Sequence, residues 1–152
     1  MTELYFEFFT TFSKMECALK EAGYLMKKDG EATANWDTFA NSVDPAILQH
    51  QDPDLQSAYR LLKESPPWKQ VAKKGRVLFE DTPFASPTET FRYYTDVLRR
   101  LRNNLFHGGK FNKSLGNNPS RNRQLVSAGL RVLEIAAVAN PRVRKIYLEI
   151  EW

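Results

Sequence analysis

Apolar residues recur every three or four positions over the first 26 residues, which is the spacing of one face of a helix. Lys27 and Lys28 follow, and then Asp29-Gly30, a basic last turn and a glycine that favour a helix end. The pattern therefore predicts a helix from Leu4 to about Lys28. Its apolar face comprises Leu4, Phe8, Phe12, Met15, Leu19, Ala22 and Met26.

The helical pattern is lost from Asp29 to Asn41, which predicts a loop with one turn around Trp36–Phe39. Two Asp-Pro pairs follow this loop. Asp44-Pro45 and Asp52-Pro53 each look like a helix start, with aspartate as the N-cap and proline in the first turn. The second pair opens a short helix that must end by Ser65-Pro66-Pro67.

Residues 68–79 and 142–152 each leave two structures open. The first stretch, Trp68 to Phe79, contains apolar residues whose spacing allows either a broken helix or a short strand. The second, Arg142 to Trp152, fits a last short helix or an extended tail. The pattern alone does not decide between these alternatives.

The clearest local signal is Ser86-Pro87-Thr88-Glu89, which has the form of a capping box with Ser86 as the N-cap. Behind it, apolar residues keep helical spacing as far as Gly108-Gly109. A loop rich in Asn, Gly and Ser covers residues 110–119, and Ser120 is the expected cap of another long helix that ends near Asn140.

These elements predict an all-α fold, an antiparallel helical bundle with two long central helices and short additional ones. Residues 1–152 are long enough for one domain, which we expect to be a single helical unit. There is no internal repeat and no regular alternation of strands and helices.

Charge is unevenly distributed along the chain, although the net charge is only +4. Residues 1–66 hold 6 basic and 11 acidic residues, a net of −5, whereas residues 67–152 hold 16 and 7, a net of +9. Ten of the eleven arginines lie in the second part. Arginine binds phosphate bidentately, so a nucleic-acid partner is one explanation, and a dimer or an acidic protein partner is another.

The composition also excludes several classes of protein. The single cysteine, Cys17, excludes an internal disulfide and a multi-cysteine zinc site. No stretch is apolar enough to span a membrane, and the acidic N-terminus does not resemble a secretory signal. We therefore expect a cytoplasmic protein without membrane association, metal or cofactor.

Only two histidines are present. His50 lies in a polar stretch between two helix starts, where a solvated or capping side chain is expected. His107 lies near a predicted helix end, in the sequence Arg102-Asn103-Asn104-Leu105-Phe106-His107, and a neutral histidine can both accept and donate protons near pH 7.

This R-N-x-x-x-H spacing resembles the motif of the HEPN superfamily, whose members carry an Arg, a polar residue and then a His four to six residues after the Arg. The general match, a helical chain of this length with the motif at the end of a long helix, extends over most of the sequence. One subset of HEPN toxins continues His-x-Tyr, whereas this chain reads His107-Gly108-Gly109. The role of that tyrosine is therefore not carried over.

The resemblance implies a metal-independent endoribonuclease of a toxin–antitoxin or antiviral type. The 2′-hydroxyl of RNA would be the nucleophile, and the products would be a 2′,3′-cyclic phosphate and a 5′-hydroxyl. By this resemblance Arg102 stabilises the phosphate, Asn103 orients the substrate and His107 transfers protons. The basic residues that flank the motif are candidates for binding RNA: Arg99, Arg100, Lys110, Lys113, Arg121 and Arg123.

Helical geometry constrains how this site can form. Five residues advance about 500°, which leaves Arg102 and His107 about 140° apart on an unbroken helix. Either the helix unwinds near Phe106–Gly108, or one site takes residues from two chains. HEPN proteins commonly dimerise around a shared cleft, so the resemblance implies a homodimer, with an antitoxin protein as a further candidate partner.

A second interpretation assigns no catalysis to these residues. A histidine before Gly-Gly is a common helix C-cap, and Arg102 would then be a solvated cation in the last turn. The chain would be a catalytically inactive helical module that binds RNA or a protein.

Overall fold

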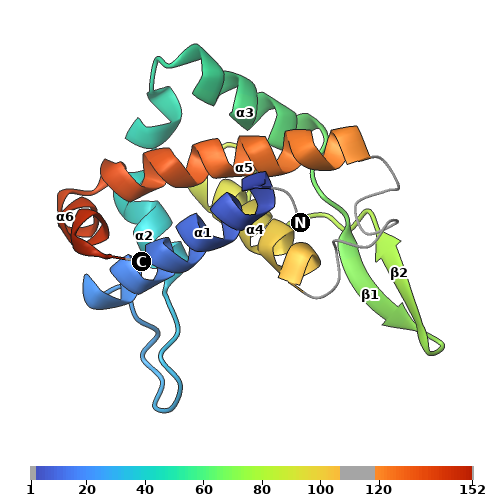
Figure 1. Ribbon diagram of the computed structural model, residues 1–152, viewed down its shortest axis with the longest axis horizontal. Coiled ribbons are helices and arrows are strands. Elements are labelled where there is room, and N and C mark those ends of the chain that lie inside the picture. Colours follow the sequence, from blue (N-terminus) through green and yellow to red (C-terminus); the bar gives the residue numbers. More distant parts are fainter. Residues whose placement is uncertain (1–2, 107–118, 152) are drawn as a thin grey trace.

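The structure, a computed structural model, describes residues 3–106 and 119–151 and is mostly helical, with one small sheet (Figure 1). A mostly helical fold is confirmed, whereas the two-stranded sheet departs from the all-α fold expected from the sequence. The elements are helices α1 (Glu3–Glu21), α2 (Trp36–Val43), the 3₁₀ helix η1 (Ala46–Gln49), α3 (Pro53–Glu64), strands β1 (Lys69–Lys73) and β2 (Arg76–Glu80), and helices α4 (Phe91–Asn104), α5 (Pro119–Ala139) and α6 (Pro141–Glu149).

Helix α5 lies across the whole molecule and contacts α1, α3, α4 and α6. Its apolar side chains on several faces are buried, as in a helix surrounded by others. At Gly129 the neighbouring helices come so close that an added Cβ would lie 2.9 Å from Leu101 Cδ1 and 3.2 Å from Phe8 Cε2. A side chain at this position would have to displace the Leu101 side chain, so glycine permits the close three-helix contact.

The bundle is not antiparallel throughout, which corrects part of the sequence prediction. Helices α4 and α5 do run in opposite directions, since Asn104, at the end of α4, and Arg121, at the start of α5, both bond to the chain between α3 and β1. Helix α1, however, runs parallel to α5. Leu4 and Gln124, near the two N-termini, line one groove, and just beyond the two C-termini Asn140 Nδ2 donates to Tyr24 Oη at 2.9 Å.

The first helix ends seven residues earlier than its apolar pattern predicts. Gly23, with φ at +96°, ends α1, and the chain then turns back on itself through an isolated bridge between Leu25 and Ala34. A positive φ favours glycine because it has no Cβ. Lys27 and Lys28 therefore lie in this exposed turn rather than in a helix.

Three helix caps use the side chains that simple local rules favour. The Asp52 carboxylate accepts the Asp54 N–H at 2.9 Å at the start of α3, which confirms that predicted start. Asn35 caps α2, an eight-residue helix where the sequence predicted only one turn. Asn140 caps α6, which settles residues 142–152 in favour of a helix over most of their length.

The predicted Ser86 cap is wrong. Helix α4 begins at Phe91, with Thr90 at its N-cap position, and Ser86 Oγ instead donates to the Asp96 carboxylate at 2.7 Å. The Phe91 N–H is satisfied by Asp44 Oδ2 at 3.1 Å. Asp44 itself follows the end of α2 instead of capping a helix of its own.

Ser120 is also not an N-cap, because α5 begins one residue before it, at Pro119. Proline suits the first turn of a helix, where its missing N–H has no intrahelical acceptor.

The ambiguous stretch 68–79 is resolved as part of a β-hairpin that continues to Glu80. Strand β1 pairs antiparallel with β2, with Lys73 opposite Arg76 across a two-residue turn. The turn residues Lys74 and Gly75 have φ values of +51° and +71°, as a type I′ turn requires. The hairpin projects from one end of the helical body (Figure 1).

Candidate functional site

The candidate motif lies at the C-terminal end of α4. Arg102 and Asn103 occupy its last turn, and residues 105–106 continue in a wider π-helical turn. His107, Lys110 and Lys113, which the sequence also singled out, lie outside the described residues. The structure therefore places two of the three candidate catalytic residues and four of the six candidate RNA-binding residues.

Arg102 faces an aromatic surface. Its guanidinium carbon lies 5.2 Å from the ring centre of Phe106 and 5.7 Å from that of Phe12. The Phe106 ring is 64% exposed and packs edge-on against Phe9 of α1. Arg102 Nη1 also donates to Asn103 Oδ1 at 3.0 Å, at the protein surface. The two residues thus form a bonded, solvent-accessible pair.

Two other residues of the same stretch fasten the hairpin to α4. Arg100 Nη1 donates to the carbonyl oxygens of Pro67, before β1, and Thr82, after β2, at 3.2 and 2.7 Å. The buried Asn104 donates to the Trp68 carbonyl at 2.8 Å. Because Arg100 and Asn104 are four residues apart, they share one face of the helix and hold both ends of the hairpin.

The Arg100 guanidinium also lies over the ring of Phe84, 3.6 Å from its centre. Burial lowers the pKa of Arg100, although the nearby Tyr93, Asp81 and Asp96 oppose this shift electrostatically. An arginine remains charged despite such a shift, so Arg100 carries a fixed positive charge in a partly desolvated position.

Arg99 is an ion-pair residue. Its Nη2 bonds to Asp96 at 2.5 Å and lies 3.4 Å from Asp37 of α2, which also pairs with Arg92. These contacts join α2 to α4. They also offset much of the charge of Arg99 that the sequence analysis assigned to RNA.

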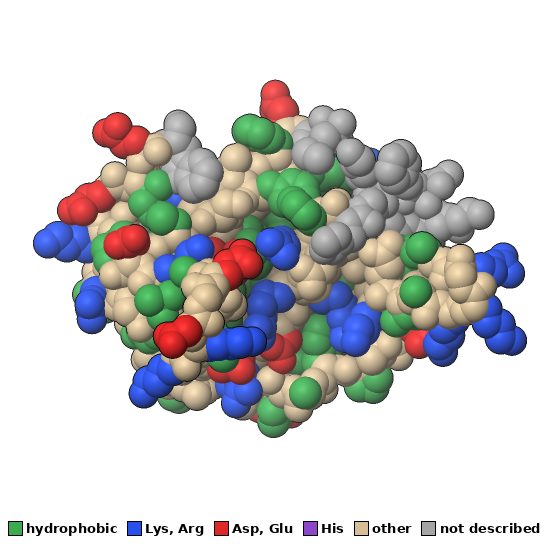
Figure 2. All heavy atoms as spheres, turned by 90° about the horizontal axis from the view of Figure 1, so that it is seen from below, with side chains coloured by type: hydrophobic (Ala, Val, Ile, Leu, Met, Phe, Trp, Pro, Cys, Tyr) green, Lys and Arg blue, Asp and Glu red, His purple; other side chains and the backbone are tan. Residues whose placement is uncertain are grey.

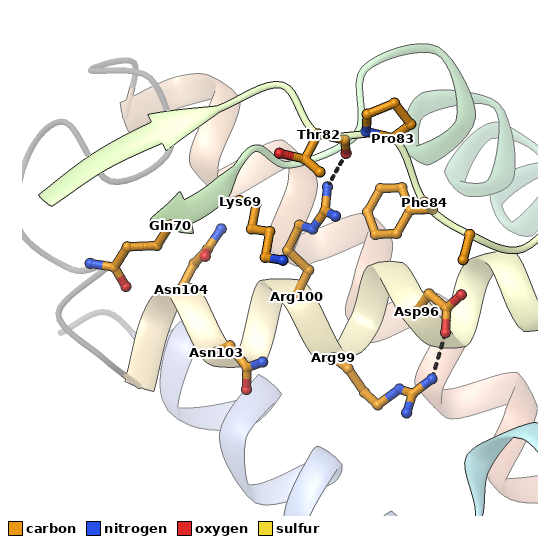
Figure 3. A pocket seen from close by; sticks show the side chains of 11 residues that line it. Lys69, Gln70, Thr82, Pro83, Phe84, Asp96, Arg99, Arg100, Asn103 and Asn104 are labelled. Atoms are coloured by element: carbon orange, nitrogen blue, oxygen red, sulfur yellow. Dashed lines mark hydrogen bonds and ion pairs between the residues drawn. The ribbon is translucent and has the colours of Figure 1, made fainter. Parts of the chain in front are cut away.

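A cleft of about 640 Å³ lies between α4, the base of the hairpin and the segment after β2 (Figure 3). Lys69 reaches from β1 toward α4, and Arg100 and Asn104 point toward the hairpin. The candidate residues Arg99, Arg100 and Asn103 all line this cleft. The complete lining is Lys69, Gln70, Thr82, Pro83, Phe84, Ala85, Asp96, Arg99, Arg100, Asn103 and Asn104.

Arg121 and Arg123 diverge at the start of α5. Arg121 Nη2 donates to the carbonyls of Ser65 and Pro66 at 3.3 and 3.1 Å, so it also supports the segment before β1. Arg123 is exposed and lines a separate groove between α3 and α5 that includes Asp54 and Leu61. The structure does not bring Arg123 into the cleft beside the motif.

Sequence reasoning missed Lys69, Gln70 and Asn104 as residues of the site. A signal for Lys69 and Gln70 was present in the hairpin pattern, because two short apolar runs flank Lys74-Gly75, and the first strand residues lie at the base of such a hairpin. What the sequence could not indicate is that this base packs on α4.

The second histidine has a local role. His50 is exposed, and its Nδ1 accepts the N–H of Asp52, the N-cap residue of α3, at 3.2 Å, which fits the solvated or capping side chain expected from the sequence. Among residues 3–106 and 119–151, no three His, Cys, Asp or Glu side chains are grouped to hold a metal ion. No helix in the same two ranges is long and apolar enough to cross a membrane.

Comparisons with known proteins give no relative: no family model, no curated protein and no solved structure matches this chain.

Proposed function

We propose that the protein is a metal-independent endoribonuclease of HEPN type, with a toxin–antitoxin or antiviral role. The observation that carries this proposal is the R-N-x-x-x-H sequence at the end of α4, together with the surface position of its first two residues. Arg102 and Asn103 are bonded to each other and accessible to a large ligand.

The chemistry assigns one role to each residue of the motif. RNA carries its own nucleophile, the 2′-hydroxyl, so cleavage requires a group that accepts its proton and one that protonates the 5′-oxygen that leaves. His107 moves these protons. The Arg102 guanidinium stabilises the charge that gathers on the phosphate oxygens, and Asn103 orients the phosphate or the 2′-hydroxyl.

The surface near the end of α4 supports this assignment. Lys and Arg side chains gather over the hairpin, at the right-hand end of Figure 2, next to the end of α4.

We place the active unit as a homodimer. Phe6, which is 65% exposed, lies one helical turn before Phe9, and Phe9 contacts the exposed Phe106 beside Arg102. Large apolar side chains that are exposed together are typical of an interaction surface. Isologous pairing of this surface brings two Arg102–Asn103 pairs together and forms two composite sites, each with Arg102 of one chain and His107 of the other.

Incubation of the protein with single-stranded RNA in excess EDTA tests the proposal. Cleavage in EDTA that leaves 2′,3′-cyclic phosphate ends, together with the resistance of 2′-O-methyl RNA, is the expected result. RNA that is bound but never cleaved would favour the alternative function, a catalytically inactive RNA-binding module. Cleavage of 2′-O-methyl RNA would contradict the proposed nucleophile.

A further inference from the structure

The cleft between α4 and the hairpin has fixed walls. Arg100 bonds to the chain on both sides of the hairpin, and Asn104 bonds to the residue before β1, so neither strand base can move independently of α4. The segment after β2 is held in addition by Phe84, which packs edge-on against Tyr93 of α4. A cleft that is formed in advance binds a ligand without the cost of ordering its walls.

The cleft is positively charged. Arg99 is neutralised locally by Asp96, but Lys69 and Arg100 form no ion pair with any described residue. The bonds of Arg100 to carbonyl groups leave its charge in place. Because Asp96 is paired with Arg99, Lys69 and Arg100 leave a net positive charge at the cavity, which attracts anions.

The cleft also leads to the motif. Asn103 lines one end of it and accepts a hydrogen bond from Arg102, which faces the α1 side of the helix, so Asn103 connects the cleft to the candidate motif. Asn103 and Gln70 carry amide groups that both donate and accept, as the edges of nucleobases do.

The volume limits what can enter. About 640 Å³ is the size of a pocket for a small organic molecule, enough for about one or two nucleotides and too small for a double helix. The hairpin continues the basic surface outward through Lys74 and Arg76, which are exposed at and beside its turn.

We propose that this cleft binds single-stranded RNA, with Lys69 and Arg100 on a phosphate and Asn103 next to the nucleotide that is cleaved. This inference rests on the proposed function and adds the substrate class and its binding site. The β-hairpin is then a substrate-binding element, which the motif alone does not indicate.

Binding of a labelled single-stranded 2′-O-methyl RNA of about ten nucleotides measures this directly, because the probe lacks the nucleophile and cannot be cleaved. Lys69→Gln should weaken binding roughly three- to tenfold and lower the slope of log affinity against log salt by about 0.7. Lys145→Gln is the matched control. It removes the same charge from an exposed site on α6 and should leave affinity and salt slope almost unchanged.

Lys69 is exposed, so its substitution should not affect folding, and equal melting temperatures of the two variants verify this. Equal weakening by Lys69→Gln and Lys145→Gln would overturn the inference. So would equal binding of an RNA duplex, or equally effective competition by an oligoglutamate peptide.

Cleavage assays separate this inference from the proposed function. If unmodified RNA is cleaved and Lys69→Gln raises KM with little change in kcat, both stand. If RNA is cleaved and KM does not change, the binding site is wrong and the nuclease stands. If RNA is never cleaved but Lys69→Gln still weakens binding, the cleft stands and the nuclease is wrong.

Discussion

Arg100 and Arg102 lie two residues apart on α4, yet their surroundings assign them different roles. Arg100 is held by two carbonyl oxygens and an aromatic ring beneath the hairpin. Arg102 is at the surface beside Phe106, with Asn103 as its hydrogen-bond partner. Residues two apart on a helix point in nearly opposite directions, about 200° apart. Arg100 therefore faces the hairpin, and Arg102 faces α1.

Substitutions of these candidate residues therefore test different things, either the structure of the hairpin base or contact with a ligand. Loss of Arg100, Asn104 or Arg121 removes bonds to the chain at the hairpin base, and a lower activity would report altered structure as well as lost ligand contacts. Loss of Arg102, in contrast, removes only a hydrogen bond at the surface and contacts with two aromatic rings. Arg102→Lys keeps the charge but cannot reproduce the bidentate contact with phosphate that the proposed function assigns to Arg102.

Asp52 should make stability depend on pH in acid. Burial acts to raise the pKa of this carboxyl, but the Asp54 N–H and the charge of Arg131 on α5 outweigh it, so the pKa lies below its usual 3.8. A lowered pKa stabilises the folded state above pH 3.8, and this contribution is lost as pH falls further through the folded-state pKa.

Asp52→Asn should therefore be less stable than the wild type at neutral pH, with a difference that shrinks below pH 3.8. Chemical denaturation at a series of pH values measures both. Asp29→Asn, in the exposed turn after α1, is the matched control and should follow the wild type throughout. A difference that grows toward low pH would contradict the assigned ion pair.

At the scale of elements, Gly129 decides how closely α5 packs on its neighbours. Gly129→Val places side-chain atoms against Leu101, Leu98 and Phe8, and we expect a loss of about 1–3 kcal/mol in the free energy of unfolding. Ser127→Val, at an exposed position of the same helix, should change it by less than about 0.5 kcal/mol. Urea denaturation of both variants tests this, and equal stabilities would contradict the close packing.

Element boundaries show where local sequence information is sufficient. Asp52 and Asn140 cap the helices that follow them directly. Such caps can be predicted from neighbouring residues in the sequence. The α4 cap comes from Asp44, 47 residues away, while the Ser86 hydroxyl bonds to Asp96. Local sequence rules cannot predict these two hydrogen bonds, because the bond to Asp44 depends on how α2 packs against α4.

The same limit explains the end of α1 and the hairpin. The apolar spacing continues to Met26, beyond the end of the helix. Leu25 and Met26 lie after Gly23 and pair with residues 33 and 34, so the helix ends before Gly23 and not before Gly30. In residues 68–79 the pattern left helix and strand open. The Lys74-Gly75 pair between apolar residues favours the hairpin, since a type I′ turn needs positive φ at both positions.

At the scale of the molecule, three surfaces meet at the end of α4. The basic cleft lies on one side, the aromatic residues Phe6, Phe9 and Phe106 lie on the other, and the motif is between them. The motif and the basic residues that flank it could be identified in the sequence. The cleft was not, because it forms only when the hairpin packs on α4.

A shared active site predicts complementation between inactive chains. Arg102→Ala and His107→Ala, each inactive alone, should regain roughly a quarter of the wild-type activity when mixed under exchange conditions, because half the dimers then hold one intact site of two. RNA cleavage by the equimolar mixture measures this. An inactive mixture, or a fully active protein that light scattering shows to be monomeric, would contradict the composite site.

The most direct measurement of the central claim is the rate of RNA cleavage by wild type and His107→Ala in EDTA, with melting temperatures recorded on the same samples. If His107 transfers the protons, the variant should lose at least about a hundredfold in rate while its melting temperature stays within about 2 °C of the wild type. Equal rates, or a loss of activity that follows a loss of folding, would contradict the assignment of His107 as the catalytic histidine.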